Sequence, residues 1–239
     1  MTTVAVIQAR HTSIRLPGKM LLPLCNVPVI SHIIARAQSV SEIDQICVTL
    51  PEGVAQKPLA DYIGTLENVH LSRGPEENLL RRFAIAAEQT SAEIVIRLWG
   101  DCPAIDPIVI RQLIQNFHDE QTDWAYLSDQ SGYPLGYECQ AFRTHVLTKA
   151  DREVTDAFDQ EALHTFLNKY PERFSRTNIW RDDIPEQCPS ELQILLDTDQ
   201  DYKKLCAIFE ALYPSSSLFG LSDVIKLVAQ HPELFWEIS

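Results

Sequence analysis

Apolar runs of strand length alternate with segments of helical periodicity along the first half of the chain. Three runs rich in β-branched residues predict buried strands, at 3–8 ("TVAVIQ"), 43–50 and 92–100. Apolar residues at helical spacing predict helices at 28–40, 74–90 and 106–120. This alternation predicts an α/β fold, a mostly parallel, Rossmann-like sheet with helices on both faces.

Two of the predicted helices carry start signals. Pro75 precedes Glu76 and Glu77, whose charges favour the positive end of a helix dipole, so we expect a helix to open at Pro75. Asp106 followed by Pro107 has the pattern of an N-cap and a first helical residue. Both helices are therefore expected to begin just after a predicted strand or turn.

The second half of the chain is less regular. Strands are expected at 122–129, within 131–142 and at 191–196, and helices at 144–151, 159–170, 199–213 and 222–235, the last capped by Ser222. No internal repeat, low-complexity tract or linker is visible. We therefore expect one domain over residues 1–239, with an irregular C-terminal part.

Charge and cysteine content exclude several classes of protein. The formal net charge of −13 disfavours nucleic acid as a partner, and 45% hydrophobic residues suffice for a core. The six cysteines form no CxxC pair, which argues against a zinc site and against a disulfide scaffold. With no signal peptide and no apolar run of ~18 residues, the prediction is a cytoplasmic protein without a membrane partner.

Positive charge gathers directly after the first predicted strand. The stretch "QARHTSIRLPGK" carries Arg10, Arg15 and Lys19, with Pro17 and Gly18 able to bend the backbone. Arginine and lysine at this density suit the oxygens of a triphosphate, although the pattern is not that of a Walker A loop. A solvated basic loop is the alternative interpretation.

Carboxylates follow two other predicted strands. Asp101 comes after Gly100, and Asp197 and Asp199 follow the run "ILL". In α/β sheets ligands bind beyond the C-terminal strand ends, where such carboxylates could hold Mg²⁺ together with phosphate oxygens. The alternatives are that Asp101 shapes a turn and that Asp199 caps the next helix.

Five segments in this order resemble the cytidylyltransferase family, in particular its spore-coat-polysaccharide branch, which is related to CMP-KDO and CMP-sialic acid synthetases. They are "QARHTSIRLPGKML", "RGPEENLLRRF", "GDCPAIDP", "YPLGYECQAF" and "LDTDQDY". The resemblance implies a nucleotide-diphospho-sugar transferase (GT-A-like) fold, with the nucleotide bound by residues 1–120 and the sugar by residues 121–239. It further implies a Mg²⁺-dependent transfer from CTP to a sugar, expected to be acidic, with release of pyrophosphate.

Roles for individual residues follow from the same resemblance. Arg15, Lys19, Asp101 and Asp197 are expected to be catalytic, and Asp101 and Asp197 to hold the metal. Nucleotide contacts are expected from Gln8, Ala9, Arg10, Ser13, Arg73, Gly74 and Gly100, with Gly100 allowing close approach of the backbone to the nucleotide. Sugar contacts are expected from Tyr133, Glu138, Gln140 and Glu161. Since relatives often pair through the second half, a homodimer is also implied.

The chain departs from the family pattern mainly on the sugar side. Thr12 stands where a glycine is usual, Asn78 replaces an aspartate and Trp99 a small polar residue. Glu138 and Gln140 replace two acids, and "QEALH" at 160–164 keeps Glu161 but loses an arginine and a histidine. We expect His164 to be a surface residue of a helix. These departures predict a changed sugar or a relaxed site.

Two other functions fit parts of the pattern. The "DTD" at 197–199 mimics the metal-binding motif of glycosyltransferases on a similar fold, although their diphosphate donors need less positive charge than the first loop supplies. A homologue without chemistry that acts as an assembly partner would also be consistent with the altered sugar side.

Overall fold

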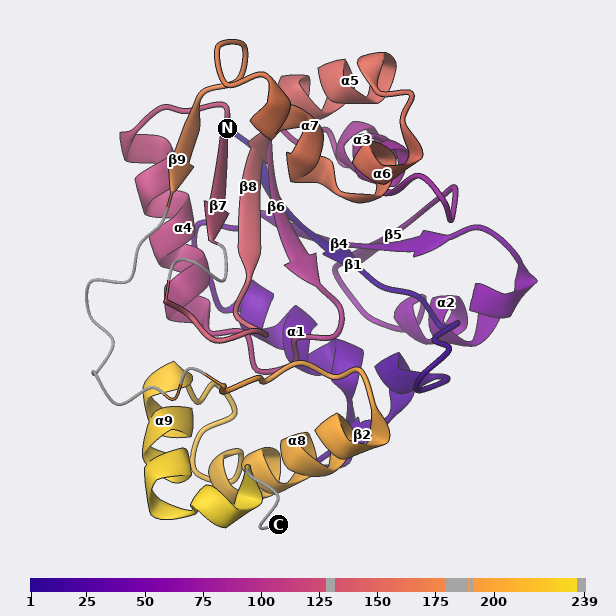
Figure 1. The fold of residues 1–239 in the computed structure, drawn as a ribbon. Coiled ribbons are helices and arrows are strands. Elements are labelled where there is room, and N and C mark those ends of the chain that lie inside the picture. The colour runs from indigo at the N-terminus through magenta and orange to yellow at the C-terminus, as the bar shows by residue number, and fades with distance from the viewer. Residues whose placement is uncertain (128–131, 179–188, 190, 236–239) are drawn as a thin grey trace.

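A seven-stranded sheet lies at the centre of the computed structural model, which describes residues 1–127, 132–178, 189 and 191–235 (Figure 1). The strand order is β5-β4-β1-β6-β8-β7-β9. The bounds are β1 Thr3–Gln8, β4 Gln45–Pro51, β5 Val69–Gly74, β6 Ile94–Trp99, β7 Trp124–Leu127, β8 Cys139–Arg143 and β9 Arg176–Asn178. A separate hairpin pairs β2 Pro23–Leu24 with β3 Val27–Pro28.

One strand reverses the direction of the sheet. β8 is antiparallel to its neighbours β6 and β7, and the other pairings of this sheet are parallel. The first four strands in space therefore have the order expected for a Rossmann-like sheet, and their C-terminal ends share one edge. The predicted α/β class with a mostly parallel sheet is confirmed.

Helices cover both faces of the sheet (Figure 1). One face carries α1 Val29–Gln38, α2 Lys57–Ile63 and α4 Pro107–Asp119. The other carries α3 Leu79–Gln89, α5 Thr144–Glu153, α6 Ala157–Glu161 and α7 Leu163–Lys169. Short 3₁₀ turns lie at Lys19–Leu21, Val54–Gln56 and Pro232–Leu234. No helix among the described residues is long and apolar enough to span a membrane.

Alternate side chains of each strand feed two separate cores. On β1, Ala5 and Ile7 join the cluster under α1 and α4, whereas Val4 and Val6 join the cluster under α3 and α5. This is the period of two expected for a strand buried on both faces. The apolar run "TVAVI" is therefore explained by burial on both sides of the sheet.

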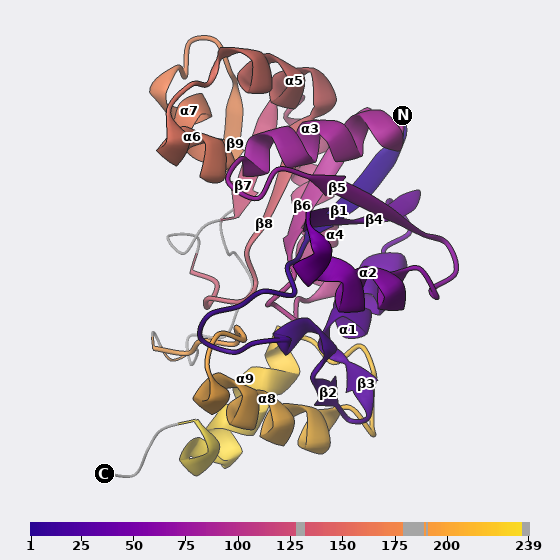
Figure 2. The same cartoon turned by 90° about the vertical axis from the view of Figure 1, so that its right-hand side faces the viewer.

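The C-terminal helices α8 Asp199–Leu212 and α9 Leu221–Gln230 lie at the opposite end of the molecule from α5 and α7 in both views (Figure 2). Asp106 joins the start of α9 to the start of α4, because its Oδ1 accepts from the Ile108 backbone N–H at 2.8 Å and its Oδ2 from that of Leu221, also at 2.8 Å. The predicted N-cap is thus confirmed, and α4 begins at Pro107 as expected.

Two predicted helix starts are wrong. α3 begins at Leu79, because Asn78 Oδ1 accepts from the Arg81 backbone N–H and caps the helix, so Pro75 lies four residues before it. α9 begins at Leu221 after Gly220, so Ser222 lies inside the helix. In the second case Gly220 has no side chain with which to cap the helix, but the carboxylate of Asp223 accepts from the Gly220 backbone N–H at 3.0 Å.

Other differences lie in the less regular half. The helix expected at 159–170 is two short helices that meet at Ala162. The segment expected to be a strand at 191–196 forms no regular strand, and among the described residues it makes one isolated bridge, between Leu135 and Gln193. The strand expected at 122–129 covers Trp124–Leu127; Ser128 and Asp129 lie outside the described residues, as does Cys188. α2 and β5 were not predicted.

Candidate active site

A pocket of about 260 Å³ opens where the parallel strands end. Its walls come from β1, the following loop, the start of α3, α6 and the segment before α8. The lining residues are Gln8, Ala9, Arg10, Arg15, Lys19, Met20, Pro51, Glu76, Leu79, Arg82, Asp101, Glu161 and Asp197. The pocket therefore gathers residues from both halves of the chain at the edge predicted for ligand binding.

The basic loop after β1 is held by the 3₁₀ turn that ends at Gln56. The Gln56 side chain accepts from the His11 backbone N–H at 2.6 Å and donates to Thr12 Oγ1 at 2.9 Å. Gly18 closes the loop with a left-handed φ of 71° and donates its N–H to the His11 carbonyl at 3.1 Å. The Thr12 hydroxyl is thus hydrogen-bonded to Gln56, at the position where the resemblance implies a glycine.

Lys19 joins the two predicted metal carboxylates. Its side chain is 7% exposed, and its Nζ donates to the Leu196 carbonyl at 2.6 Å. The same Nζ lies 3.1 Å from Asp101 Oδ2 and 3.5 Å from Asp197 Oδ1. Two carboxylates from distant parts of the chain therefore converge on one cationic atom.

Arg15 adds a second cation to this cluster, because its Nη2 pairs with Asp197 Oδ2 while most of its side chain remains exposed. Asp197 is held from both sides. The Leu196 N–H donates to the Asp101 carbonyl at 2.7 Å, and Thr198 and Asp201 form a capping box at the start of α8. The predicted group of Arg15, Lys19, Asp101 and Asp197 is thus brought together at one side of the pocket.

Gly100 has a structural reason to be glycine. A Cβ there would lie 2.5 Å from the Gln8 carbonyl oxygen and 3.1 Å from the sulfur of Met20. The Gly100 N–H donates to that same carbonyl at 2.8 Å. Close approach of β1 therefore accounts for this glycine, where the family resemblance implied close approach of a nucleotide.

The remaining predicted residues divide into two groups. Gln8, Ala9, Arg10 and Glu161 line the pocket, whereas Ser13, Arg73, Gly74, Tyr133 and Glu138 are not among its lining residues. Tyr133 instead donates to Gln112 of α4 at 2.9 Å. Glu138 accepts from the Gly136 N–H at 2.7 Å, and the Ser13 hydroxyl accepts from the Leu16 N–H at 3.3 Å. These last two bonds shape loops.

Gln140 lies behind the pocket, fully buried in a polar row across the sheet. The row contains Gln8, Arg97 and Gln140 on adjacent strands, with His164 of α7 beside Gln140. His164 is half-buried and its ring lies 4.9 Å from that of Tyr126, so the prediction of a surface histidine is wrong. Burial, followed by the charges of Arg97 and Arg176, lowers the pKa of His164.

Two arginines at the site were not predicted. Arg82 of α3 lines the pocket and is 6% exposed, and Arg97 of β6 is 4% exposed. Burial is the main cause that lowers the pKa of Arg82 to about 10 and that of Arg97 to about 9. The visible signal for Arg97 was a charged residue in the otherwise apolar run "IVIRLW".

Comparison with known proteins places this geometry in a family. The sequence profile of the family described as "Cytidylyltransferase" matches residues 4–231. The chain belongs to the cytidylyltransferase family. The resemblance inferred from the motifs is therefore confirmed at the level of the family.

Relatives and solved structures agree with this assignment. The chain is 24% identical over 233 residues to the spore coat polysaccharide biosynthesis protein SpsF of Bacillus subtilis, covering 95% of this chain and 94% of that protein. It is 35% identical over 130 residues to a 3-deoxy-manno-octulosonate cytidylyltransferase of Sinorhizobium medicae, covering 52% and 50% of the two chains.

The fold is shared with solved cytidylyltransferases. A cytidylyltransferase from Leptospira borgpetersenii superposes with a TM-score of 0.90 at 22% identity, covering 100% of this chain and 98% of that one. A CMP:2-keto-3-deoxy-manno-octonic acid synthetase complexed with CTP gives a TM-score of 0.67 at 20% identity, covering 88% and 99%.

Proposed function

We propose that the protein transfers CMP from CTP to a sugar acid used for a surface polysaccharide, with release of pyrophosphate. One observation carries the proposal: the Lys19 ammonium sits between Asp101 and Asp197 at the floor of a pocket that Arg10 and Arg15 also line. The family and the named relatives support the cytidylyl group and the polysaccharide context.

The cations explain how a triphosphate would be held and cleaved. Arg15 and Lys19 would bind its β- and γ-phosphate oxygens, and Arg10 would add charge at the rim of the pocket. A sugar hydroxyl oxygen would then form a bond to the α-phosphorus and lose its proton to solvent, while the bond from that phosphorus to the bridging oxygen breaks and its electrons leave with pyrophosphate. Because the leaving pyrophosphate gains negative charge, the fixed cations stabilise the transition state more than the ground state.

Asp101 and Asp197 fit a divalent cation. Both carboxylates already converge on one positive atom, the Lys19 Nζ, and Mg²⁺ is commonly bound by one or two carboxylates plus phosphate oxygens and water. Among the described residues no cluster of three or more His, Cys, Asp or Glu side chains could hold a metal, so substrate oxygens and water would complete the shell. When bound, Mg²⁺ would neutralise phosphate charge. A structure of Rv0371c from Mycobacterium tuberculosis in complex with manganese belongs to the same fold group, with a TM-score of 0.58.

Pyrophosphate release tests this proposal. The full-length protein is incubated with Mg²⁺, each of the four common nucleoside triphosphates in turn and a panel of sugar acids that includes 3-deoxy-manno-octulosonate. We expect release with CTP and loss of that release in Asp101→Asn. Asp199→Asn is the matched control, because Asp199 pairs with the exposed Lys203 at 2.7 Å. An absence of release with every nucleotide and sugar would contradict the proposal.

The two alternative functions predict other results. A glycosyltransferase would prefer a UDP-sugar to CTP, but Asp199 pairs with Lys203 and is 68% exposed, so the "DTD" motif does not supply two converging carboxylates. An assembly partner without chemistry need not bind Mg²⁺–CTP, whereas measurable affinity that disappears in Asp101→Ala favours an enzyme. Pairing of two copies through the second half stays a prediction, which light scattering would test.

A further inference from the structure

Two arginines lie buried beside the pocket without an ion-pair partner. Arg82 and Arg97 are 6% and 4% exposed, and within the described part of the chain neither forms a salt bridge. Buried arginine is rare unless it is paired, because removing a charge from water is costly. A negative group that is absent from the protein itself would explain why both are kept.

The hydrogen bonds of Arg97 go to neutral groups. Its Nε donates to Gln8 Oε1 at 2.9 Å and its Nη1 donates to Gln140 Oε1 at 3.0 Å. Both of these acceptors, within the described part of the chain, are uncharged amide oxygens. The guanidinium also lies 4.1 Å from the ring centroid of Trp99 and 5.6 Å from that of Phe83, so amides and aromatic rings hold it in place without supplying a negative charge.

Gln140 is itself locked in a neutral arrangement. Since its Oε1 accepts from Arg97, its Nε2 faces the Nδ1 of His164 at 3.4 Å, which favours an unprotonated Nδ1. Tyr126 covers the histidine ring at 4.9 Å. The hydrogen bonds of this row join Gln8, Arg97, Gln140 and His164, and none of these side chains is a carboxylate, so a glutamate at position 140 would be the simplest way to neutralise Arg97.

Arg82 has still fewer partners. Its Nε is buried without a hydrogen-bond partner, and its side chain forms part of the pocket wall. The charges of Arg10 and Arg82 lower the pKa of Arg82 and Arg97 respectively, after the larger effect of burial. Glu76 and Asp101 act in the opposite sense without forming ion pairs with them. Like charges that repel one another in a buried wall favour the entry of an anion.

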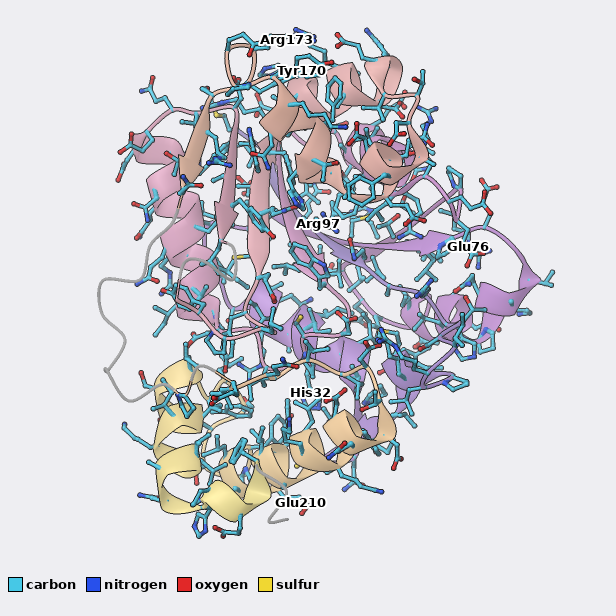
Figure 3. All side chains as sticks on the ribbon, in the orientation of Figure 1. His32, Glu76, Arg97, Tyr170, Arg173 and Glu210 are labelled. Atoms are coloured by element: carbon cyan, nitrogen blue, oxygen red, sulfur yellow. The ribbon has the colours of Figure 1, made fainter. Side chains whose placement is uncertain are left out.

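We propose that Arg82 and Arg97 form an oxyanion subsite that takes a carboxylate or phosphate oxygen of a substrate, separate from the cradle of Arg15 and Lys19. This inference rests on the proposed function, since Arg82 lines the same pocket and Arg97 bonds to Gln8 of its wall. Arg97 lies near the centre of the molecule (Figure 3), in the row that continues onto β8 and β7. Arg97 itself belongs to the first half of the chain, but the row ends at Gln140 and Tyr126 in the half expected to bind the sugar, which favours the carboxylate of the sugar over a phosphate of the nucleotide.

Gln140→Glu is the decisive variant, because it keeps the size of the side chain and supplies Arg97 with a carboxylate. Arg82→Gln removes the other charge. Arg81→Gln is the matched control on the same helix, where Arg81 is 49% exposed and pairs with Asp151 at 2.8 Å. We also expect the unliganded Gln140→Glu protein to unfold at a temperature no lower than the wild type, which separates loss of binding from loss of folding.

Two measurements separate the sources of the oxyanion. CTP affinity is measured by calorimetry with Mg²⁺. The thermal shift of CTP-saturated protein is then compared for 3-deoxy-manno-octulosonate and its C1 alcohol, and for glucuronate and glucose. From the part of the shift that is specific to a sugar acid, we expect the apparent affinity for the acid to fall by roughly tenfold or more in both subsite variants. The CTP affinity of these variants should stay within about twofold of that of the wild type and of Arg81→Gln.

Each outcome decides the question. A loss of CTP affinity in both subsite variants would keep the subsite but assign it to a phosphate. Unchanged CTP affinity together with unchanged or absent acid-specific shifts would overturn the subsite, even if wild-type protein binds CTP and the proposed function stands. Failure of the wild type to bind any nucleotide would instead count against the proposed function, and the sugar-acid shift would then be compared among the variants without nucleotide, where equal shifts would overturn the subsite.

Discussion

Replacing Lys19 by methionine should destabilise the free protein and create a site for a divalent cation without nucleotide. The methionine keeps most of the buried stem but leaves Asp101 and Asp197 facing one another and the Leu196 carbonyl without its donor. In the wild type we expect no such cation site in the absence of CTP, because the ammonium of Lys19 and the guanidinium of Arg15 already occupy the carboxylates.

The size of the effect follows from the exposure of the partners. Removing one member of a buried ion pair costs about 3–5 kcal/mol. Asp101 and Asp197 remain 32% and 20% exposed, so water offsets part of the loss. We therefore expect the free energy of unfolding to fall by about 2–3 kcal/mol, a loss of roughly 4–12 °C in Tm for a chain of this size.

Thermal unfolding in the absence of nucleotide, with and without MnCl₂, measures both the loss of stability and the new cation site. Mn²⁺ at about 100 times its Kd should return about 2.7 kcal/mol to Lys19→Met and leave the wild type unchanged. Lys203→Met is the control, because Lys203 is 76% exposed and pairs with the exposed Asp199. If Lys19→Met were as stable as the control, or gained nothing from Mn²⁺, the convergence of the two carboxylates on one cation position would be refuted.

Three other predictions test local features. Gly100→Ala should lower the free energy of unfolding by roughly 1–3 kcal/mol in urea titrations, since its Cβ would lie 2.5 Å from the Gln8 carbonyl; an unaffected midpoint would contradict this. Asn78→Ala should cost about 1 kcal/mol in the same assay by removing the cap of α3, whereas Asn78→Asp should retain it. Burial lowers the pKa of His164 below 6.5, so at falling pH the unfolded chain takes up the proton first and the free energy of unfolding declines. His164→Gln should lessen this decline between about pH 7 and pH 5. If the free energy of unfolding fell equally steeply with pH in the two proteins, this reasoning would be contradicted.

Local patterns predicted the parts of the fold that are fixed by neighbouring residues. β1 has the expected bounds because its alternate side chains fill two cores, and α4 begins where Asp106 and Pro107 indicate. The start of α3 was missed because two acidic residues and a proline resemble a first turn, although Asn78 supplies the actual side-chain cap. Charge near a helix start is a weaker signal than a hydrogen bond to a free N–H.

The sequence predicted the part of the candidate site that follows β1 and β6, but not the contacts that place Asp197. Arg15, Lys19 and Asp101 lie in short motifs next to strand ends, so their approach follows from the parallel order of the strands. Asp197 follows no regular strand, and its place depends on the Leu196–Asp101 backbone bond and on the capping box of α8. The Leu196–Asp101 bond links residues nearly a hundred positions apart, and no local pattern reports it, whereas the capping box joins residues only three positions apart.

The charge at the back of the pocket depends on long-range register. Arg97 meets Gln140 only because β8 runs antiparallel to β6 in a register that pairs these two residues, and Tyr126 joins them through the next strand. A shift of one residue would turn each of these side chains to the other face of the sheet. Lys19, Asp101 and Asp197 lie outside this row. If the proposed subsite is correct, we therefore expect a substitution at position 140 to change the charge at the back of the pocket without replacing a residue of the Lys19 cluster.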